Sequence, residues 1–332
     1  MKICYLSPTI SRPHGGIRVF FEHCNSLAEL GHEVTLQVMG SGMDKVWAHI
    51  DDRVSIRYGN IIADEFDVVV AGWPPHALIL RDAKIKAKKF FLLQMAEHLF
   101  DPNNKNFARI CFEAYKVPFP IIGISRWVEY LVRTEGKRGD LPMYYVGNGV
   151  SADFKPGKQD DGITILVEGW EPLNHSKDVS FIAAKTAARL KKEFGATVLA
   201  YSQKPITYLK EVPDEFYQVP TQSQLVELYQ RSHIILKASL LDARSCAPVE
   251  AIACGCVPVR AIRHGDDDLT HLYNCLRTEY AEEPFYQAAK RLIERPVIRN
   301  VLRANGLKYR TEQLDWGKQM SIIEDIFINS QP

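Results

Sequence analysis

The chain has 332 residues, 46% of them hydrophobic and 24% charged, with 41 basic against 40 acidic side chains. This length is typical of two domains of about 150 residues, each large enough to bury a core. The near-zero net charge excludes a strongly basic nucleic-acid-binding domain, and the high apolar content excludes intrinsic disorder. The longest apolar stretch, Val68 to Leu80, contains two prolines and is shorter than the ~20 residues of a membrane-spanning helix.

The first half of the chain alternates strand-length apolar runs with amphipathic helical stretches, a pattern typical of parallel α/β sheets. Apolar residues at helical spacing predict a helix over Ile17–Leu30, which Gly31 is expected to end. Ser125 is predicted to cap a helix over Trp127–Thr134. The strands expected in this half are Lys2–Leu6, Glu33–Met39, Phe66–Ala71, Lys89–Gln94 and Pro120–Ile124.

The glycine-rich stretch Val146–Lys158, with its Asn-Gly turn signal, predicts a linker between domains. A second α/β series follows it. We therefore predict two Rossmann-like, doubly wound parallel-sheet domains, residues 1–150 and 151–310, with ligands bound at the carboxyl ends of the strands in a cleft that the domains face. The elements expected here are the strands Thr164–Val167, Ala196–Tyr201, His233–Leu236 and Val257–Ala261, and the helices Ser180–Glu193, Gln222–Gln230 and Ser321–Phe327.

The number and placement of the cysteines indicate the redox environment of the protein. Seven are scattered through apolar segments, and this odd number disfavours a disulfide framework, so we expect a reducing, cytoplasmic location. The N-terminal run MKICYLSP has the length of a strand and is too short for a secretory signal. Cys254 and Cys256 with His264 and His271 raise the alternative of a zinc site, which the lack of a C-x-x-C pair disfavours.

The segment SRPHGGIR, Ser11 to Arg18, lies between the first strand and the first helix. Gly15 and Gly16 allow backbone N–H groups to approach a ligand closely, and a helix N-terminus favours an anion. The alternative is an ordinary strand-to-helix turn. The spacing of a dinucleotide-binding or Walker loop is absent from the segment.

The segment DARSCAPVEAIACG, Asp242 to Gly255, is the most informative. Pro248 suits the first position of a short helix, Glu250 its first turn and Gly255 its C-terminal cap. Carboxylates accept hydrogen bonds from paired sugar hydroxyls, while amides at a helix N-terminus bind phosphate oxygens. The segment therefore indicates a nucleotide-sugar site, with a carboxylate that only complements the helix dipole as the alternative for Glu250.

The pattern of an acid, seven residues and then Pro-x-Glu-Ala-x-Ala-x-Gly resembles the donor-site motif of family 4 retaining glycosyltransferases with the GT-B fold. The resemblance covers nearly the whole chain. It includes Gly15-Gly16 with the following helix and strand, Gly123–Trp127, Asn148-Gly149-Val150 with Phe154-x-Pro156, and the helix at Trp316. It implies that residues 311–332 form a helix crossing back to the first domain.

The resemblance also implies roles for individual residues. Glu250 would hold the ribose hydroxyls, Asp242 would contact the donor hexose, and Lys177 would neutralise the diphosphate. The backbone amides of Arg244, Ser245 and Cys246 would line the sugar and diphosphate, and Gly16 would close over the diphosphate from the first domain.

The chain departs from the family pattern in three places, one of which is Ala243-Arg244-Ser245, where the family has Gly-Phe-Gly after the first acid. The usual arginine beside the lysine is missing, because Trp170 and Glu171 follow Gly169, so Arg244 or Arg18 would have to supply the second positive charge. Asp242 is one methylene shorter than the usual glutamate, which changes its reach to the hexose.

The segment QMAEHLFD follows a predicted strand of the first domain, where an acceptor should bind. Its Gln-x-x-Glu pattern is similar to a branch of the family acting on rhamnose-rich bacterial surface glycans. Glu97 or His98 would then steer the acceptor hydroxyl, and the alternative is a glutamate at a helix start beside a half-exposed histidine.

Two runs of charged residues give weaker indications of function than the motifs above. Gly265-Asp266-Asp267-Asp268 could suggest a metal site, but clustered acids in a turn are typical of a solvated loop, and we assign neither a metal nor another cofactor. The basic run Lys84–Lys89 suggests weak peripheral contact with an anionic membrane at the inner face of the cell membrane, with full solvation as the alternative.

These readings predict a retaining hexosyltransferase that moves a hexose from a nucleoside-diphosphate sugar to a glycan or lipid-linked acceptor in bacterial polysaccharide assembly. A GT-B sugar-nucleotide epimerase and a non-catalytic nucleotide-sugar-binding relative are the alternatives. Nucleic acid is not expected as a partner.

Overall fold

The computed structural model describes residues 1–11, 15–40, 46, 49–99, 101–169, 180–202, 212–239, 242–262 and 266–330. The chain divides into two compact units. Unit 1 comprises Met1–Gly149 and Trp316–Pro332, and unit 2 comprises Val150–Asp315. The divisions therefore fall at 149/150 and 315/316, against the predicted 150/151 and 310/311.

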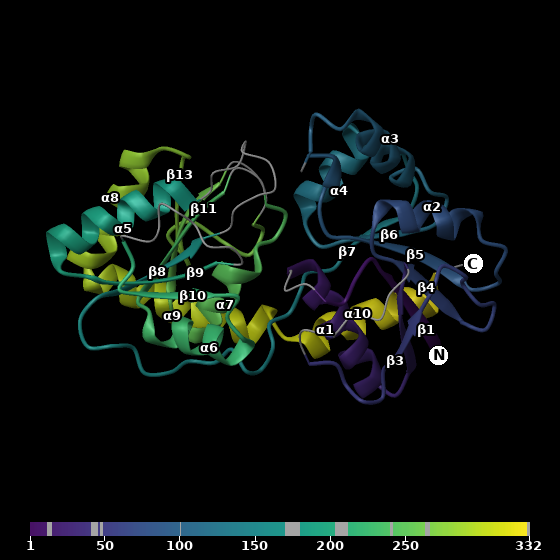
Figure 1. Cartoon of the computed structure of the whole chain (residues 1–332), viewed down its shortest axis with the longest axis horizontal. Helices are drawn as coiled ribbons and strands as arrows, with labels where there is room; N and C mark the ends of the chain where they lie inside the picture. The colour runs from purple at the N-terminus through teal and green to yellow at the C-terminus, as the bar shows by residue number, and fades with distance from the viewer. Residues whose placement is uncertain are drawn as a thin grey trace. The chain divides into compact units, whose positions relative to one another are not determined.

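Unit 1 is built around a parallel sheet with the strand order β3-β2-β1-β4-β5-β6-β7 (Figure 1). Its strands are β1 (Lys2–Ser7), β2 (Glu33–Val38), β3 (Ser55–Tyr58), β4 (Val68–Ala71), β5 (Lys88–Leu93), β6 (Ile121–Gly123) and β7 (Met143–Tyr145). Its helices are α1 (Gly15–Glu29), α2 (Pro74–Asp82), the 3₁₀ turn η1 (Glu97–Leu99), α3 (Lys105–Ala114), α4 (Arg126–Thr134) and α10 (Trp316–Asn329).

Helices α1 and α10 pack together over one face of this sheet. The ring of Phe327 in α10 lies 4.8 Å from that of Phe90 in β5, and Trp316 contacts His23 of α1 edge-on at 5.5 Å. Lys88 Nζ donates to the carbonyls of Phe327 and Ile328, at 3.0 and 2.8 Å, at the end of α10. The last helix of the chain is therefore part of the core of unit 1.

The end of α1 confirms the predicted glycine cap. Gly31 has a φ of +89°, a left-handed conformation that glycine adopts without steric cost. The amides of Gly31 and His32 donate to the carbonyls of Ala28 and Leu27, the two hydrogen bonds of a Schellman motif. The chain then enters β2 directly.

Unit 2 contains a second parallel sheet, with the order β10-β9-β8-β11-β12-β13 (Figure 1). Its strands are β8 (Thr164–Gly169), β9 (Thr197–Ser202), β10 (Glu215–Gln218), β11 (Ile234–Ser239), β12 (Val257–Ile262) and β13 (Leu276–Thr278). Its helices are α5 (Ser180–Phe194), α6 (Gln222–Arg231), α7 (Cys246–Cys254), α8 (Glu282–Glu294) and α9 (Pro296–Gln313).

Apolar side chains cover both faces of this sheet. One core cluster packs α5 and α8 against the strands, and another packs α6 and α7 against the opposite face. Burial on both faces explains why the central strands read as continuous apolar runs in the sequence. None of the described helices combines the length and the apolar character needed to cross a membrane.

Candidate functional site

Three charged side chains lie side by side across the sheet of unit 2, near the carboxyl ends of its strands. Lys237 in β11 is in register with Arg260 in β12, and Glu168 lies in β8, the other neighbour of β11. Lys237 Nζ contacts Glu168 Oε2, and their side chains are only 5% and 17% exposed. A buried charge needs a close partner of opposite sign, which Lys237 and Glu168 supply for each other.

Arg260 is fully buried and joins two carboxylates. Its Nε contacts Asp266 Oδ2, and its Nη2 donates to Asp242 Oδ2 at 3.0 Å. Its Nη1 lies 3.4 Å from the carbonyl oxygen of Lys237. Burial disfavours the charged guanidinium, but the negative charges of Asp266 and Asp242 outweigh that effect and raise the pKa of Arg260.

The loop after β12 holds the segment before α7 in place. Asp266, at a φ of +59°, accepts the Ser245 amide proton at an N···O distance of 3.1 Å. Asp268 forms a two-point ion pair with Arg244 and accepts a hydrogen bond from Tyr309 at 2.6 Å. The carboxylates of this loop therefore fix both Arg244 and the backbone at Ser245.

The expectation of a solvated acidic loop is wrong for two of its three aspartates. Asp266 and Asp268 are buried, at 2% and 3% exposure, because each neutralises a buried arginine, whereas Asp267 is exposed. Within the described residues, no group of three or more His, Cys, Asp or Glu side chains could hold a metal ion. His264, one candidate ligand of the zinc alternative, lies outside the described residues.

Helix α7 begins two residues earlier than the sequence suggested. It starts at Cys246, so Pro248 is its third residue and Glu250 lies beyond its first turn. Gly255 ends the helix at a φ of +88°, as predicted. Because the charge–dipole effect falls off within the first turn, this position weakens the interpretation of Glu250 as a residue that only complements the helix dipole.

A chain of hydroxyl groups reaches Glu250 beneath the surface of unit 2. Tyr201 and Tyr229 join their hydroxyls at 2.8 Å, and the Tyr229 hydroxyl donates to Glu250 Oε2 at 3.3 Å. Glu250 is 5% exposed, and burial raises the pKa of Tyr229. A neutral tyrosine hydroxyl thus orients the carboxylate for which the sequence suggested ribose binding.

The remaining predicted donor residues lie elsewhere. Gly15, Gly16 and Arg18 occupy the first turn of α1 in unit 1, where Gln94 Nε2 donates to the Gly16 carbonyl at 3.0 Å. Lys177 lies outside the described residues. Cys246 is the first residue of α7, next to the amide that Asp266 engages.

The two acceptor candidates of unit 1 differ in their surroundings. His98 is buried, with Nδ1 at 3.0 Å from the Tyr115 hydroxyl and Nε2 at 3.2 Å from a Glu135 oxygen. Glu97 Oε2 is buried without a hydrogen-bond partner among the described residues, and burial raises the pKa of Glu97 to about 8. Both ring nitrogens of His98 are therefore engaged, while Glu97 keeps hydrogen-bonding capacity.

The basic run of unit 1 is partly used in folding. Besides the contacts of Lys88 with α10, Lys89 Nζ donates to the Ala83 carbonyl at 2.7 Å. Lys84 and Lys86 are exposed. Two lysines of the run are thus available to solvent or to an anionic surface.

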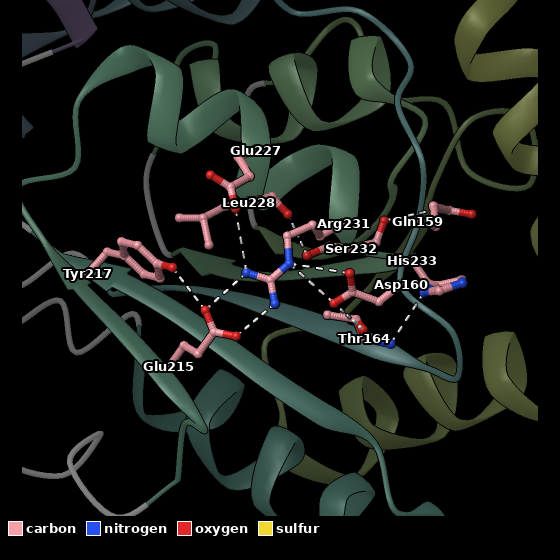
Figure 2. Close-up of polar contacts among 10 residues, drawn as sticks. All are labelled: Gln159, Asp160, Thr164, Glu215, Tyr217, Glu227, Leu228, Arg231, Ser232 and His233. Atoms are coloured by element: carbon pink, nitrogen blue, oxygen red, sulfur yellow. Dashed lines mark hydrogen bonds and ion pairs between the residues drawn. The ribbon is translucent and has the colours of Figure 1, made fainter.

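At the opposite edge of the sheet of unit 2, where the strands begin, Figure 2 shows a second arginine, Arg231, that pairs with three carboxylates, those of Glu215, Asp160 and Glu227. Arg231 donates to both oxygens of Glu215, at 3.0 and 2.7 Å, and its Nε lies 3.3 Å from each oxygen of Asp160. These bonds tie the end of α6 to β10 and to the segment before β8. Like Arg260, Arg231 thus connects separate segments of unit 2 through their carboxylates.

Lys237, Arg260, Glu168 and Tyr229 were not predicted as site residues from the sequence. A signal was present for the first two, because each interrupts an apolar strand pattern, IILKAS and VPVRAI. A charged residue inside a strand buried on both faces requires a partner, and such a residue is therefore a marker of a buried polar network.

No protein-family model matches the chain, and a search of the curated proteins finds no match. Solved structures do resemble it. Sucrose-phosphate synthase from Thermosynechococcus elongatus is 11% identical, with a TM-score of 0.80 and 98% of each chain covered. HepE of Anabaena, in complex with UDP-glucose, is 13% identical, with a TM-score of 0.76 over 99% of this chain and 100% of HepE.

WaaG, a glycosyltransferase involved in lipopolysaccharide biosynthesis, is 11% identical, with a TM-score of 0.72 over 99% of this chain and 100% of WaaG. At such identities the likeness concerns the fold. The two parallel-sheet α/β domains match the GT-B fold of these structures, which confirms the predicted fold class.

Proposed function

We propose that the chain is a glycosyltransferase that binds a nucleoside-diphosphate sugar at the carboxyl edge of the sheet of unit 2. The observation that carries this proposal is the paired placement of Asp242 and Glu250, each held by a buried partner, on either side of the start of α7. Structural neighbours crystallised with UDP and UDP-glucose make a uridine nucleotide the first donor to test.

In the proposed complex, Glu250 accepts hydrogen bonds from the ribose hydroxyls and Asp242 accepts one from the sugar. Amides at the start of α7 and Lys177 stabilise the diphosphate, which gains negative charge as its bond to the anomeric carbon breaks. Fixed donors of this kind act without reorganising during the reaction. Because the amide of Ser245 donates to Asp266, the phosphate donors in this proposal are backbone N–H groups of α7 itself, excluding Pro248, which has none.

We propose retention at the anomeric carbon. The acceptor oxygen attacks from the face that the diphosphate leaves, forming the new glycosidic bond, and the departing phosphate oxygen takes the acceptor proton. Glu97 is the favoured residue for orienting the acceptor hydroxyl, because His98 has both nitrogens engaged. A glycan or lipid-linked acceptor, a hexose donor and a reaction without a metal ion are parts of the same proposal.

A ligand panel tests this function. Thermal stabilisation is measured with UDP, GDP and dTDP and with a sugar derivative of each, and the best donor is then incubated with glycan acceptors and analysed by mass spectrometry. The proposal expects stabilisation by at least one pair and an acceptor product that is heavier by one sugar. Inversion of the free nucleotide-sugar at C2 would instead identify an epimerase, and the absence of nucleotide binding a non-catalytic relative.

A further inference from the structure

Arg260 lies between the predicted sugar-contacting acid and the loop that carries Asp266. Its guanidinium uses different nitrogens for each: Nη2 for Asp242 at 3.0 Å and Nε for Asp266. Asp242 is 25% exposed at its side chain, whereas Arg260 is 0% exposed. The arginine is therefore inaccessible to a ligand, but it contacts a carboxylate that a ligand can reach.

The surroundings of Arg260 leave it little freedom. It pairs in register with Lys237 on the neighbouring strand, and Lys237 is itself neutralised by Glu168. Its third nitrogen lies near the Lys237 carbonyl. Because each nitrogen of the planar guanidinium faces a separate acceptor, the group has a fixed orientation, and it transmits that orientation to Asp242.

Asp242 has a short side chain, so the direction in which its carboxylate points determines whether it can reach a sugar hydroxyl. An aspartate carboxylate on a loop can rotate about two side-chain bonds, and a hydrogen bond to a sugar hydroxyl requires one specific rotamer. A partner that fixes this rotamer before the ligand binds reduces the side-chain entropy that is lost on binding.

We propose that Arg260, anchored by Asp266, is a positioning residue that holds Asp242 for the donor sugar and so sets the preference of the site for a nucleotide-sugar over the free nucleoside diphosphate. This inference rests on the proposed function. It assigns Arg260 no contact with the donor. The effect of Arg260 is therefore confined to the part of the ligand that Asp242 contacts.

The test compares two affinities in each variant. Isothermal titration measures the dissociation constants of UDP and UDP-glucose, or of the corresponding GDP or dTDP pair if the wild-type protein prefers it. Arg260→Lys keeps the positive charge but cannot bridge two carboxylates in the same geometry. We expect it to weaken nucleotide-sugar binding about tenfold, the size of one lost charge-assisted hydrogen bond, while nucleoside diphosphate binding changes less than about twofold.

Two further variants separate positioning from folding. Asp242→Asn should lower the same preference, and the double variant Arg260→Lys/Asp242→Asn should show no further loss, because both changes act through one contact. Arg231→Lys is the control, since it alters an arginine that also joins carboxylates of separate segments, at the far edge of the same sheet. It should leave the ratio of the two affinities unchanged.

The outcomes are distinguishable. If the wild-type protein binds no member of the three pairs, the proposed function fails and this inference with it. If the wild-type protein binds both ligands of a pair and Arg260→Lys changes their ratio no more than Arg231→Lys does, only the inference is overturned. Should Arg260→Lys not fold, Asp266→Asn, which removes the second anchor of Arg260, is measured in its place against the same two outcomes.

Discussion

The buried ion pair between Lys237 and Glu168 should dominate the stability of the carboxyl edge of unit 2. Replacing Lys237 by Met preserves most of the aliphatic volume and leaves the Glu168 carboxylate without its lysine. Removing one partner of a buried pair costs about 3–5 kcal/mol, because the other charge stays desolvated. We expect the lower end, about 3 kcal/mol, since the positive charge of Arg260 also acts on Glu168.

The assay is urea unfolding followed by far-UV circular dichroism, with the free energy of unfolding compared at an unchanged denaturant slope. Lys185→Met is the matched control in the same unit, because Lys185 pairs with Glu282 while both side chains are 45% and 41% exposed. An exposed pair of this kind contributes at most about 1 kcal/mol. The double variant Lys237→Met/Glu168→Gln should recover most of the loss, since it removes the unpaired charge. A loss for Lys237→Met no larger than that for Lys185→Met would refute the reasoning.

Three other substitutions test separate parts of the structure. Burial raises the pKa of Glu97 to about 8, so between about pH 5 and 8 the folded state keeps a proton that the unfolded state has lost, and the free energy of unfolding falls as the pH rises. Glu97→Gln should flatten this slope in urea titrations, and identical slopes in both proteins would contradict the assignment. Glu250→Ala should weaken nucleotide binding by about 1.5–3 kcal/mol in calorimetry, the effect of losing a charged acceptor, and unchanged affinity in a folded variant would remove the ribose role. Arg231→Ala should lower the free energy of unfolding by about 2 kcal/mol without changing nucleotide affinity, since its bonds to Glu215 and Asp160 lie at the far edge of the sheet, and a stability equal to that of the wild type would count against it.

The sequence predicted the central strands well and the edge strands poorly. Strands such as β1 and β11 are buried on both faces, so their apolar runs are uninterrupted or nearly so. The edge strands β3 and β10, with sequences SIRY and EFYQ, have exposed or half-exposed residues and no apolar run to detect. Helix α2 was not predicted, although its two prolines lie in its first turn, where proline suits a helix.

The candidate site shows a similar division between local and long-range information. The motif identified Asp242 and Glu250 because their spacing is encoded within one short segment. Their partners Arg260 and Tyr229 come from other elements, and no local pattern links them to the motif. The start of α7 was misplaced for the same reason: Ser245 makes no side-chain capping bond, and Asp266, twenty-one residues away, accepts its amide proton instead.

The charges at the carboxyl edge of unit 2 limit which residues can neutralise a diphosphate there. The network contains three cations, Lys237, Arg244 and Arg260, and four carboxylates, Glu168, Asp242, Asp266 and Asp268. Its formal charge is therefore −1, and Arg244, which the sequence suggested as a replacement for the missing arginine, already forms a two-point pair with Asp268. An anionic ligand at this edge gains no net attraction from the network, so the favourable charge must come from the amides of α7 and from a cation outside it. Lys177 is the cation that the motif supplies, and the charge count makes the proposed donor site more dependent on it than a site with a second, unpaired arginine would be.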